Sequence, residues 1–133
     1  MKYFIATDIH GSYFFAKKVV EEFEKSGADK LVLLGDLYYH GPRNPFPQDY
    51  APMKVAELFN SLSGKIIAIK GNCDAEIDEM ISTFPFSPAV HVNVGGERVT
   101  FTHGHYFNKD VLPIGCDLLV YGHFHVNELT ERD

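Results

Sequence analysis

Short apolar runs alternate with amphipathic stretches along this chain, and this alternation restricts its fold more than any other feature. Runs of strand length occupy residues 3–7, 30–34, 65–69, 89–94, 98–103 and 117–121. Helix-like segments separate the first three runs. Strands and helices in this order are typical of layered α/β folds with parallel strands at their centre. The sequence therefore predicts an α/β architecture.

Two segments predict helices from the spacing of their apolar residues. After Ser12, the residues Phe15, Val19 and Phe23 recur on one helical face, and the segment ends before Gly27. Residues 55–62 have a similar spacing. Residues 38–52 are rich in Pro and Gly and predict an irregular loop, whereas the Gly-Gly-Glu at 95–97 predicts a hairpin turn.

The length of 133 residues, without a repeat or linker, predicts a single domain over residues 1–133. No apolar run approaches the roughly 20 residues of a membrane span. A charged residue also comes too early for a signal peptide, so we expect a cytoplasmic protein without a membrane partner. Cys73 and Cys116 are too few for a disulfide framework, and neither belongs to a CxxC pair that would suit a thiolate zinc site.

The formal net charge of −6 argues against a surface that binds DNA or RNA polymers, because such surfaces neutralise phosphates with Lys and Arg. A small anionic substrate stays compatible with this charge if bound metal ions supply the positive charge.

Short polar motifs follow most of the predicted strands. They contain Asp8 and His10 (TDIHG), Asp36 (GDL), Asn72 (GNCD), His103 and His105 (THGH), and His123 and His125 (GHFH). Ligands of open α/β sheets bind beyond the carboxyl ends of the strands, so these side chains are expected to converge. His123 and His125, one residue apart, would point the same way from an extended segment.

Each motif alone has an ordinary explanation. A Gly-Asp pair after a strand is usually a turn, a single His is usually packed or hydrogen-bonded, and Asp8 could cap the following helix. Five motifs that each supply a ligand-type side chain, without a competing Lys or Arg, favour a shared metal site instead. Nitrogen and oxygen donors without thiolate suit Mn²⁺, Fe²⁺, Co²⁺ or Zn²⁺, whereas several imidazoles make Mg²⁺ and Ca²⁺ poor choices.

The order D-x-H, G-D, G-N, G-H and G-H-x-H resembles the signature of the calcineurin-like metallophosphoesterases. The Cys after Asn72 and the loop HGPRNPFPQDYAP resemble the small bacterial YfcE-type phosphodiesterases. This resemblance, which spans nearly the whole chain, implies a sandwich of β-sheets flanked by helices. Members of the family usually continue with further strands past G-H-x-H, so we expect this domain to lack the usual C-terminal strands and to leave a sheet edge unpaired.

The resemblance also implies two divalent metal ions, most simply Mn²⁺, with Zn²⁺, Fe²⁺ or Co²⁺ as alternatives. One ion would be held by Asp8, His10, Asp36 and His125, and the other by Asp36, Asn72, His103 and His123. Asp36 would bridge them, because a carboxylate has two oxygens whereas an imidazole offers one lone pair. Asn72 would bind its ion through a neutral amide oxygen.

The implied activity is hydrolysis of a small phosphodiester by a hydroxide that bridges two metals about 3.5–4 Å apart. The candidate catalytic residues are Asp36, Asn72, Cys73 and His105. Many relatives have His where this chain has Cys73, and a thiol is a weaker proton donor for a leaving group. The sequence thus favours diesters whose leaving groups need little help, unless Cys73 is a small buried side chain without a chemical role.

Other residues keep two interpretations each. His105 would contact the substrate phosphate or brace His103, His40 would line a pocket or stay in solvent, and Arg43 would bind an anion or form a surface ion pair. His91, inside a predicted strand, is expected to be structural.

Alternative functions are a non-catalytic scaffold like the metallophosphoesterase-like subunit of retromer, an inactive fragment, or a phosphomonoesterase or nucleotide hydrolase. Relatives often self-associate, so a homo-oligomer is also possible.

Overall fold

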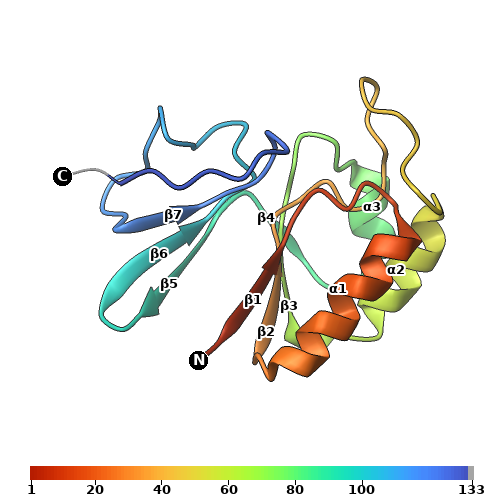
Figure 1. Ribbon diagram of the computed structural model, residues 1–133, viewed down its shortest axis with the longest axis horizontal. Helices are drawn as coiled ribbons and strands as arrows, with labels where there is room; N and C mark the ends of the chain where they lie inside the picture. The colour runs from red at the N-terminus through yellow and green to blue at the C-terminus, as the bar shows by residue number, and fades with distance from the viewer. Residues whose placement is uncertain (132–133) are drawn as a thin grey trace.

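Two β-sheets and one layer of helices form the fold in the computed structural model, which describes residues 1–131 (Figure 1). The first sheet has the order β1 (Tyr3–Ala6), β2 (Lys30–Leu33), β3 (Ile66–Ile69) and β4 (Phe86–Ser87), and its neighbouring strands are parallel. The second has the order β5 (Val90–Val94), β6 (Glu97–Phe101) and β7 (Leu118–Val120). Strands β5 and β6 pair antiparallel, and β6 and β7 pair parallel. The predicted α/β class with flanking helices is confirmed.

The helices are α1 (Tyr13–Ser26), α2 (Pro52–Asn60), α3 (Glu76–Ile81) and a 3₁₀ turn, η1 (Ser63–Lys65). Ser12 caps α1, because its hydroxyl accepts a hydrogen bond from the backbone N–H of Phe15 at 3.2 Å. Asp8 is therefore not the cap of this helix. Helix α1 ends before Gly27, as the sequence predicted, and Gly27 has a left-handed conformation. Within residues 1–131, no helix has the length and apolar character needed to cross a bilayer.

The first sheet is the middle layer, with α1 and α2 on one face and the second sheet on the other (Figure 1). Strand β2 shows why both faces are covered. Its residues Leu31 and Leu33 are buried in the cluster that includes residues of α1 and α2, while Val32 is buried in the cluster that includes Val99 and Phe101 of β6. Burial on both faces holds the carboxyl ends of β1, β2 and β3 in fixed positions.

Two elements lie in a stretch to which the sequence analysis assigned no structure. Helix α3 has only six residues and β4 only two, so neither is long enough to show a period. The predicted strands otherwise agree with the structure to within about two residues at their ends, a usual margin. Residues 38–51 form an irregular loop, as predicted.

Candidate metal centre

The polar motifs leave their strands through sharp turns. Five of the predicted metal ligands have a left-handed backbone: Asp8 (φ 56°), His10 (50°), Asp36 (56°), His123 (74°) and His125 (56°). Such a conformation costs a non-glycine residue about 1–2 kcal/mol. It persists only where the surrounding contacts impose it, and strain of this kind is common at functional sites.

The expectation that His123 and His125 point the same way from an extended segment is wrong. Strand β7 ends at Val120, and both histidines lie in the loop after it with positive φ angles. They reach the site because the chain turns at each of them.

The first group of donor atoms comes from Asp8, His10 and His125. His125 Nε2 lies 3.1 Å from Asp8 Oδ1 and 3.4 Å from His10 Nε2, and His10 Nε2 lies 3.4 Å from Asp8 Oδ1. Three donors at such mutual distances can face a single cation.

The second group comes from Asp36, Asn72, His103 and His123. His103 Nε2 lies 3.1 Å from Asp36 Oδ2, 2.9 Å from Asn72 Oδ1 and 3.1 Å from His123 Nδ1. His123 Nδ1 is 3.0 Å from Asn72 Oδ1. The ligand atoms of Asp36, His103 and His123 lie within 4.8 Å of one another, so they can face one ion.

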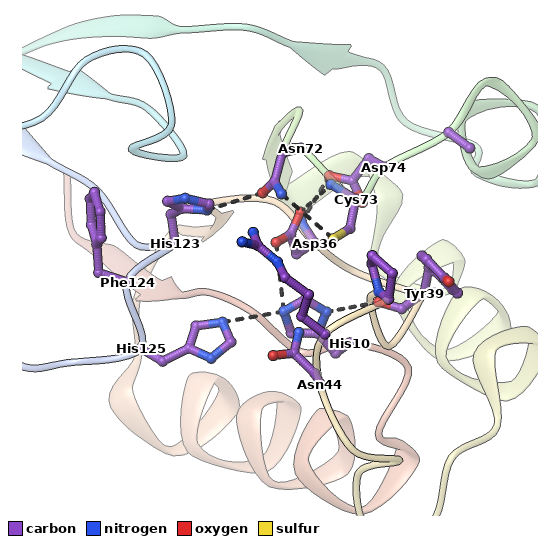
Figure 2. A pocket seen from close by; sticks show the side chains of 13 residues that line it. His10, Asp36, Tyr39, Asn44, Asn72, Cys73, Asp74, His123, Phe124 and His125 are labelled. Carbon is purple, nitrogen blue, oxygen red and sulfur yellow. Dashed lines mark hydrogen bonds and ion pairs between the residues drawn. The ribbon is translucent and has the colours of Figure 1, made fainter.

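Asp36 lies between the two groups (Figure 2). Its Oδ2 is 3.1 Å from His103 Nε2 and 3.6 Å from His10 Nε2, whereas its Oδ1 accepts a hydrogen bond from the backbone N–H of Cys73 at 2.8 Å. The position between the groups agrees with the expected bridge. One oxygen faces both groups, however, rather than one oxygen facing each.

Hydrogen bonds outside the site fix the lone pairs that point into it. His10 Nδ1 lies 2.8 Å from the carbonyl oxygen of Tyr39, and His103 Nδ1 lies 2.7 Å from that of Leu34. Because a carbonyl only accepts, each Nδ1 carries the proton and each Nε2 directs its lone pair into the site. This tautomer is the one that a metal ion requires.

The electrostatics of the site also favour a cation. Burial opposes the ionised form of Asp8, but the neighbouring His10 imidazole and the hydrogen bonds from the Thr7 hydroxyl and the backbone N–H of His123 hold the pKa of Asp8 well below the ordinary value. Burial similarly opposes a charged His103, yet the adjacent Asp36 raises the pKa of that imidazole. Carboxylate oxygens beside imidazole nitrogens form a donor set that suits divalent ions of the Mn²⁺ or Zn²⁺ type.

The sequence analysis missed the role of Asp74, which is only 7% exposed. Its Oδ2 accepts hydrogen bonds from the backbone N–H groups of Asp36 (2.8 Å) and Gly71 (2.7 Å), and its Oδ1 accepts one from Leu37 (2.9 Å). Burial nevertheless raises the pKa of Asp74 above its ordinary value. Asp74 thus ties the loop after β2 to the loop after β3, a role that a single Asp in a loop does not indicate.

Two glycines of the motifs allow the loops to approach one another. A Cβ atom on Gly71 would overlap Asp36 Oδ1 and lie 2.7 Å from the Asp36 nitrogen. A Cβ atom on Gly122 would overlap Thr7 Oγ1 and lie 2.6 Å from Asp8 Oδ2. The glycines of G-N and G-H-x-H are therefore needed for packing beside the donor atoms.

An open cavity of about 500 Å³ lies over the donor atoms (Figure 2). Its polar base includes His10, Asp36, Asn72, His123 and His125. Residues 39 and 42–44 of the long loop form another part of its lining, and Phe124 forms a third. The exposed Arg43 lines the cavity and forms no ion pair with a carboxylate among residues 1–131.

A family comparison agrees with the motifs. Residues 1–133 match the model of the calcineurin-like phosphoesterase superfamily domain. The chain belongs to this superfamily.

Within the calcineurin-like phosphoesterases, the chain is 47% identical to phosphodiesterase YfcE of Escherichia coli K12 over 135 residues, which cover 99% of this chain and 73% of that protein. The same values hold for YfcE of E. coli O157:H7. A solved structure of YfcE, described as a phosphoesterase from E. coli, matches with a TM-score of 0.82 and 47% identity over 85% of this chain. The match covers 63% of that solved chain, less than two thirds of its length.

An archaeal phosphodiesterase structure matches all of this chain and 79% of its own with a TM-score of 0.72 and 24% identity, which indicates a shared fold. The predicted family and its YfcE-type branch are confirmed, as is the prediction that the chain belongs to a family of phosphoesterases.

In this member of the superfamily, Cys73 lines the cavity. Burial and the nearby Asp36 and Asp74 raise the pKa of its thiol to about 11. The thiol is thus protonated at neutral pH and a weak acid. The backbone N–H of Cys73 has a clearer role, because it holds Asp36 Oδ1.

The other histidines lie away from the cavity lining. The ring of His105 lies 5.3 Å from that of His103 and 4.1 Å from that of Tyr106, and its Nδ1 is buried without a hydrogen-bond partner among the described residues. Burial and the neighbouring His103 lower the pKa of His105. This geometry fits packing beside His103 better than contact with a substrate.

His40 and His91 each contact a neighbouring side chain outside the cavity lining. His40 packs in the long loop against Phe46, with ring centroids 4.4 Å apart. His91 Nδ1 lies 2.7 Å from Thr100 Oγ1 across the β5–β6 pair, in agreement with a structural role.

Proposed function

We propose that this chain is a metal-dependent phosphodiesterase with two ion sites that share Asp36. The position of Asp36 Oδ2, 3.1 Å from His103 Nε2 and 3.6 Å from His10 Nε2, carries the proposal. Asp8, His10, Asp36 and His125 would hold one ion, and Asp36, Asn72, His103 and His123 the other. Divalent ions held there, most simply Mn²⁺, would acidify a water toward neutral pH and offset negative charge on the phosphoryl oxygens.

The protein's own residues would orient these groups and receive the substrate. The backbone carbonyls of Tyr39 and Leu34 keep His10 and His103 in the ligating tautomer. Arg43 lines the cavity as a cation that can attract the phosphate anion. The acidic charge of the chain as a whole and the limited size of the cavity favour a small phosphodiester over a nucleic-acid polymer.

The thiol of Cys73 supports a preference for diesters over monoesters. A protonated group with a pKa of about 11 gives a departing alkoxide little assistance. Substrates whose leaving groups depart without protonation would therefore react best. His105, which packs behind His103, would act on the reaction only through that ligand.

The donor arrangement also counts against the scaffold alternative. A protein that uses this surface only for assembly does not need seven donor side chains in ligating orientations. The proposal also includes a cytoplasmic location and self-association of the enzyme. Gel filtration of the metal-loaded protein would test the self-association.

The proposal can be tested with metal-free protein reloaded with Mn²⁺. We expect about two ions per chain by elemental analysis and faster hydrolysis of bis(p-nitrophenyl) phosphate than of p-nitrophenyl phosphate. Asp36→Asn should lower kcat/KM for the diester by at least about a hundredfold, since it removes the shared ligand. Asp110→Asn, at an exposed position, is the matched control.

Equal diester hydrolysis by Asp36→Asn and the wild-type protein would show that the assigned centre is wrong. A clear preference of the wild-type protein for the monoester would favour the phosphomonoesterase alternative.

A further inference from the structure

Phe124 stands between the two histidines of the last motif, and its ring lines the cavity. The side chain is 52% exposed. Figure 2 shows it beside His123 at the margin of the cavity. A single exposed apolar residue is common on protein surfaces. Phe124, however, borders a cavity whose other lining residues are mainly polar.

The local backbone explains the placement of Phe124. His123 and His125 on either side of it have φ angles of 74° and 56°, and the Phe124 N–H donates a hydrogen bond to the Gly122 carbonyl at 3.0 Å. The turns that direct the two histidines into the site therefore also fix the position of Phe124. Its position relative to the site is set by the ligands themselves.

Among the aromatic residues of the described chain, two have rings next to that of Phe124. Its centroid lies 4.9 Å from that of His123 and 6.2 Å from that of Tyr121, both in edge-to-face geometry. About half of the side chain is exposed, so part of the ring is open to solvent. It can accept another planar group in an offset-stacked or edge-to-face arrangement.

A second aromatic side chain, Tyr39, lines the cavity from the long loop and is 42% exposed. In Figure 2, Tyr39 and Phe124 lie at opposite sides of the cavity, with His10 and Asp36 between them. A phosphodiester also carries one organic group on each side of its phosphorus. The cavity thus has aromatic surface where the organic groups of a bound diester would extend.

We propose that Phe124 is a specificity-determining residue that binds a planar aromatic substituent, an aryl ring or a nucleobase, of the phosphodiester. This inference rests on the proposed function, because the phosphate has to sit over the donor groups for its substituent to reach Phe124. Aromatic pairs contribute beyond their buried area, and the gain corresponds to a preference of about three- to tenfold.

Binding of slowly hydrolysed diesters tests the proposal. Diphenyl, dicyclohexyl and diethyl phosphate carry the same charge, but only the first is aromatic, and the second controls for apolar bulk. We expect calorimetry with the Mn²⁺-loaded protein to show diphenyl phosphate binding about three- to tenfold more tightly than dicyclohexyl phosphate. Phe124→Ala should abolish this preference, and Phe124→Tyr should keep it.

Phe15→Ala is the matched control, because Phe15 is 48% exposed on α1 and does not line the cavity. It should leave all three dissociation constants unchanged. A preference for diphenyl phosphate that survives in Phe124→Ala would overturn the inference, as would its absence from the wild-type protein.

Hydrolysis of bis(p-nitrophenyl) phosphate, measured in parallel, separates the two proposals. A wild-type protein that binds the diesters without hydrolysing this substrate would refute the phosphodiesterase assignment, whereas the ratio of dissociation constants would still decide the role of Phe124.

Discussion

The carboxylate of Asp74 accepts a hydrogen bond from the backbone N–H of Asp36 at 2.8 Å, so a residue after β3 holds the proposed bridging residue after β2. Two further N–H groups, of Leu37 and Gly71, donate to the same carboxylate. An amide in its place has only one acceptor oxygen. We expect Asp74→Asn to lower the free energy of unfolding by about 1–3 kcal/mol, because at least one buried N–H loses its partner.

Urea unfolding of the metal-free protein measures this change without a contribution from bound ions. The exposed Asp110→Asn should stay close to the wild-type value. An Asp74→Asn protein as stable as the wild type would mean that the three hydrogen bonds contribute little.

Gly122→Ala should damage the first donor group. The new methyl group would overlap Thr7 Oγ1 and press on Asp8 Oδ2, the oxygen that receives hydrogen bonds from Thr7 and from the backbone of His123. We expect the metal content to fall from about two ions toward one per chain and diester hydrolysis to drop at least about tenfold. Gly64→Ala, whose added methyl group would meet no atom within 4 Å, should retain both properties.

Removal of the metal ions should destabilise the folded chain. Ions that bind only the native state stabilise it by about 2.7 kcal/mol for each site at a free concentration of about 100 times Kd. We expect addition of Mn²⁺ to raise the Tm of the metal-free wild-type protein in differential scanning calorimetry, and EDTA to reverse the change. Asp36→Asn should show a much smaller shift, and a full shift in that variant would place the ions elsewhere.

Arg43→Gln should raise KM for an anionic diester and leave kcat nearly unchanged. The residue is exposed, so its attraction for the phosphate is screened, and we expect a change of about two- to fivefold. Arg43→Lys keeps the positive charge and should therefore leave KM close to the wild-type value. Steady-state kinetics at low and high salt would check the origin of the change, because an electrostatic contribution diminishes as the salt concentration rises.

Cys73→Ala should keep kcat/KM for bis(p-nitrophenyl) phosphate within about threefold of the wild-type value, since nitrophenolate leaves without a proton donor. The substitution retains the backbone N–H that binds Asp36 Oδ1. A loss of activity larger than about tenfold, with metal content unchanged, would assign the thiol a direct part in the reaction.

The regular parts of the fold could be predicted from sequence, because α1 has a helical spacing of apolar residues, β2 is a continuous apolar run, and the β5–β6 hairpin alternates apolar and polar residues on both sides of a Gly-Gly turn. The meeting of Asp8, Asp36 and Asn72 could be predicted, because the parallel strands β1, β2 and β3 bring their carboxyl ends to one edge of the first sheet. Helix α3 and strand β4 could not, since six and two residues are too short for a pattern.

The finer geometry of the site depends on contacts between distant residues. No local feature indicates that Asp74 receives three backbone N–H groups from two loops, or that His123 and His125 approach through left-handed turns. The Asp74 hydrogen bonds depend on how the loops after β2 and β3 of the first sheet meet, and the approach of the two histidines depends on how the second sheet packs against the first. Likewise, the exposure of Phe124 at the cavity follows from those turns, which the G-H-x-H motif alone does not indicate.

The two sheets contribute donors from opposite ends of the chain, with Asp8, His10, Asp36 and Asn72 following strands of the first sheet and His103, His123 and His125 following strands of the second. During synthesis from the N-terminus, the first four therefore leave the ribosome well before the last two histidines. Until the segment after β7 has been made, a nascent chain holds five of the seven proposed ligands. The proposed metal centre would thus be complete only after the segment that follows β7 has been made, and we expect the full set of ligands to require the chain through His125.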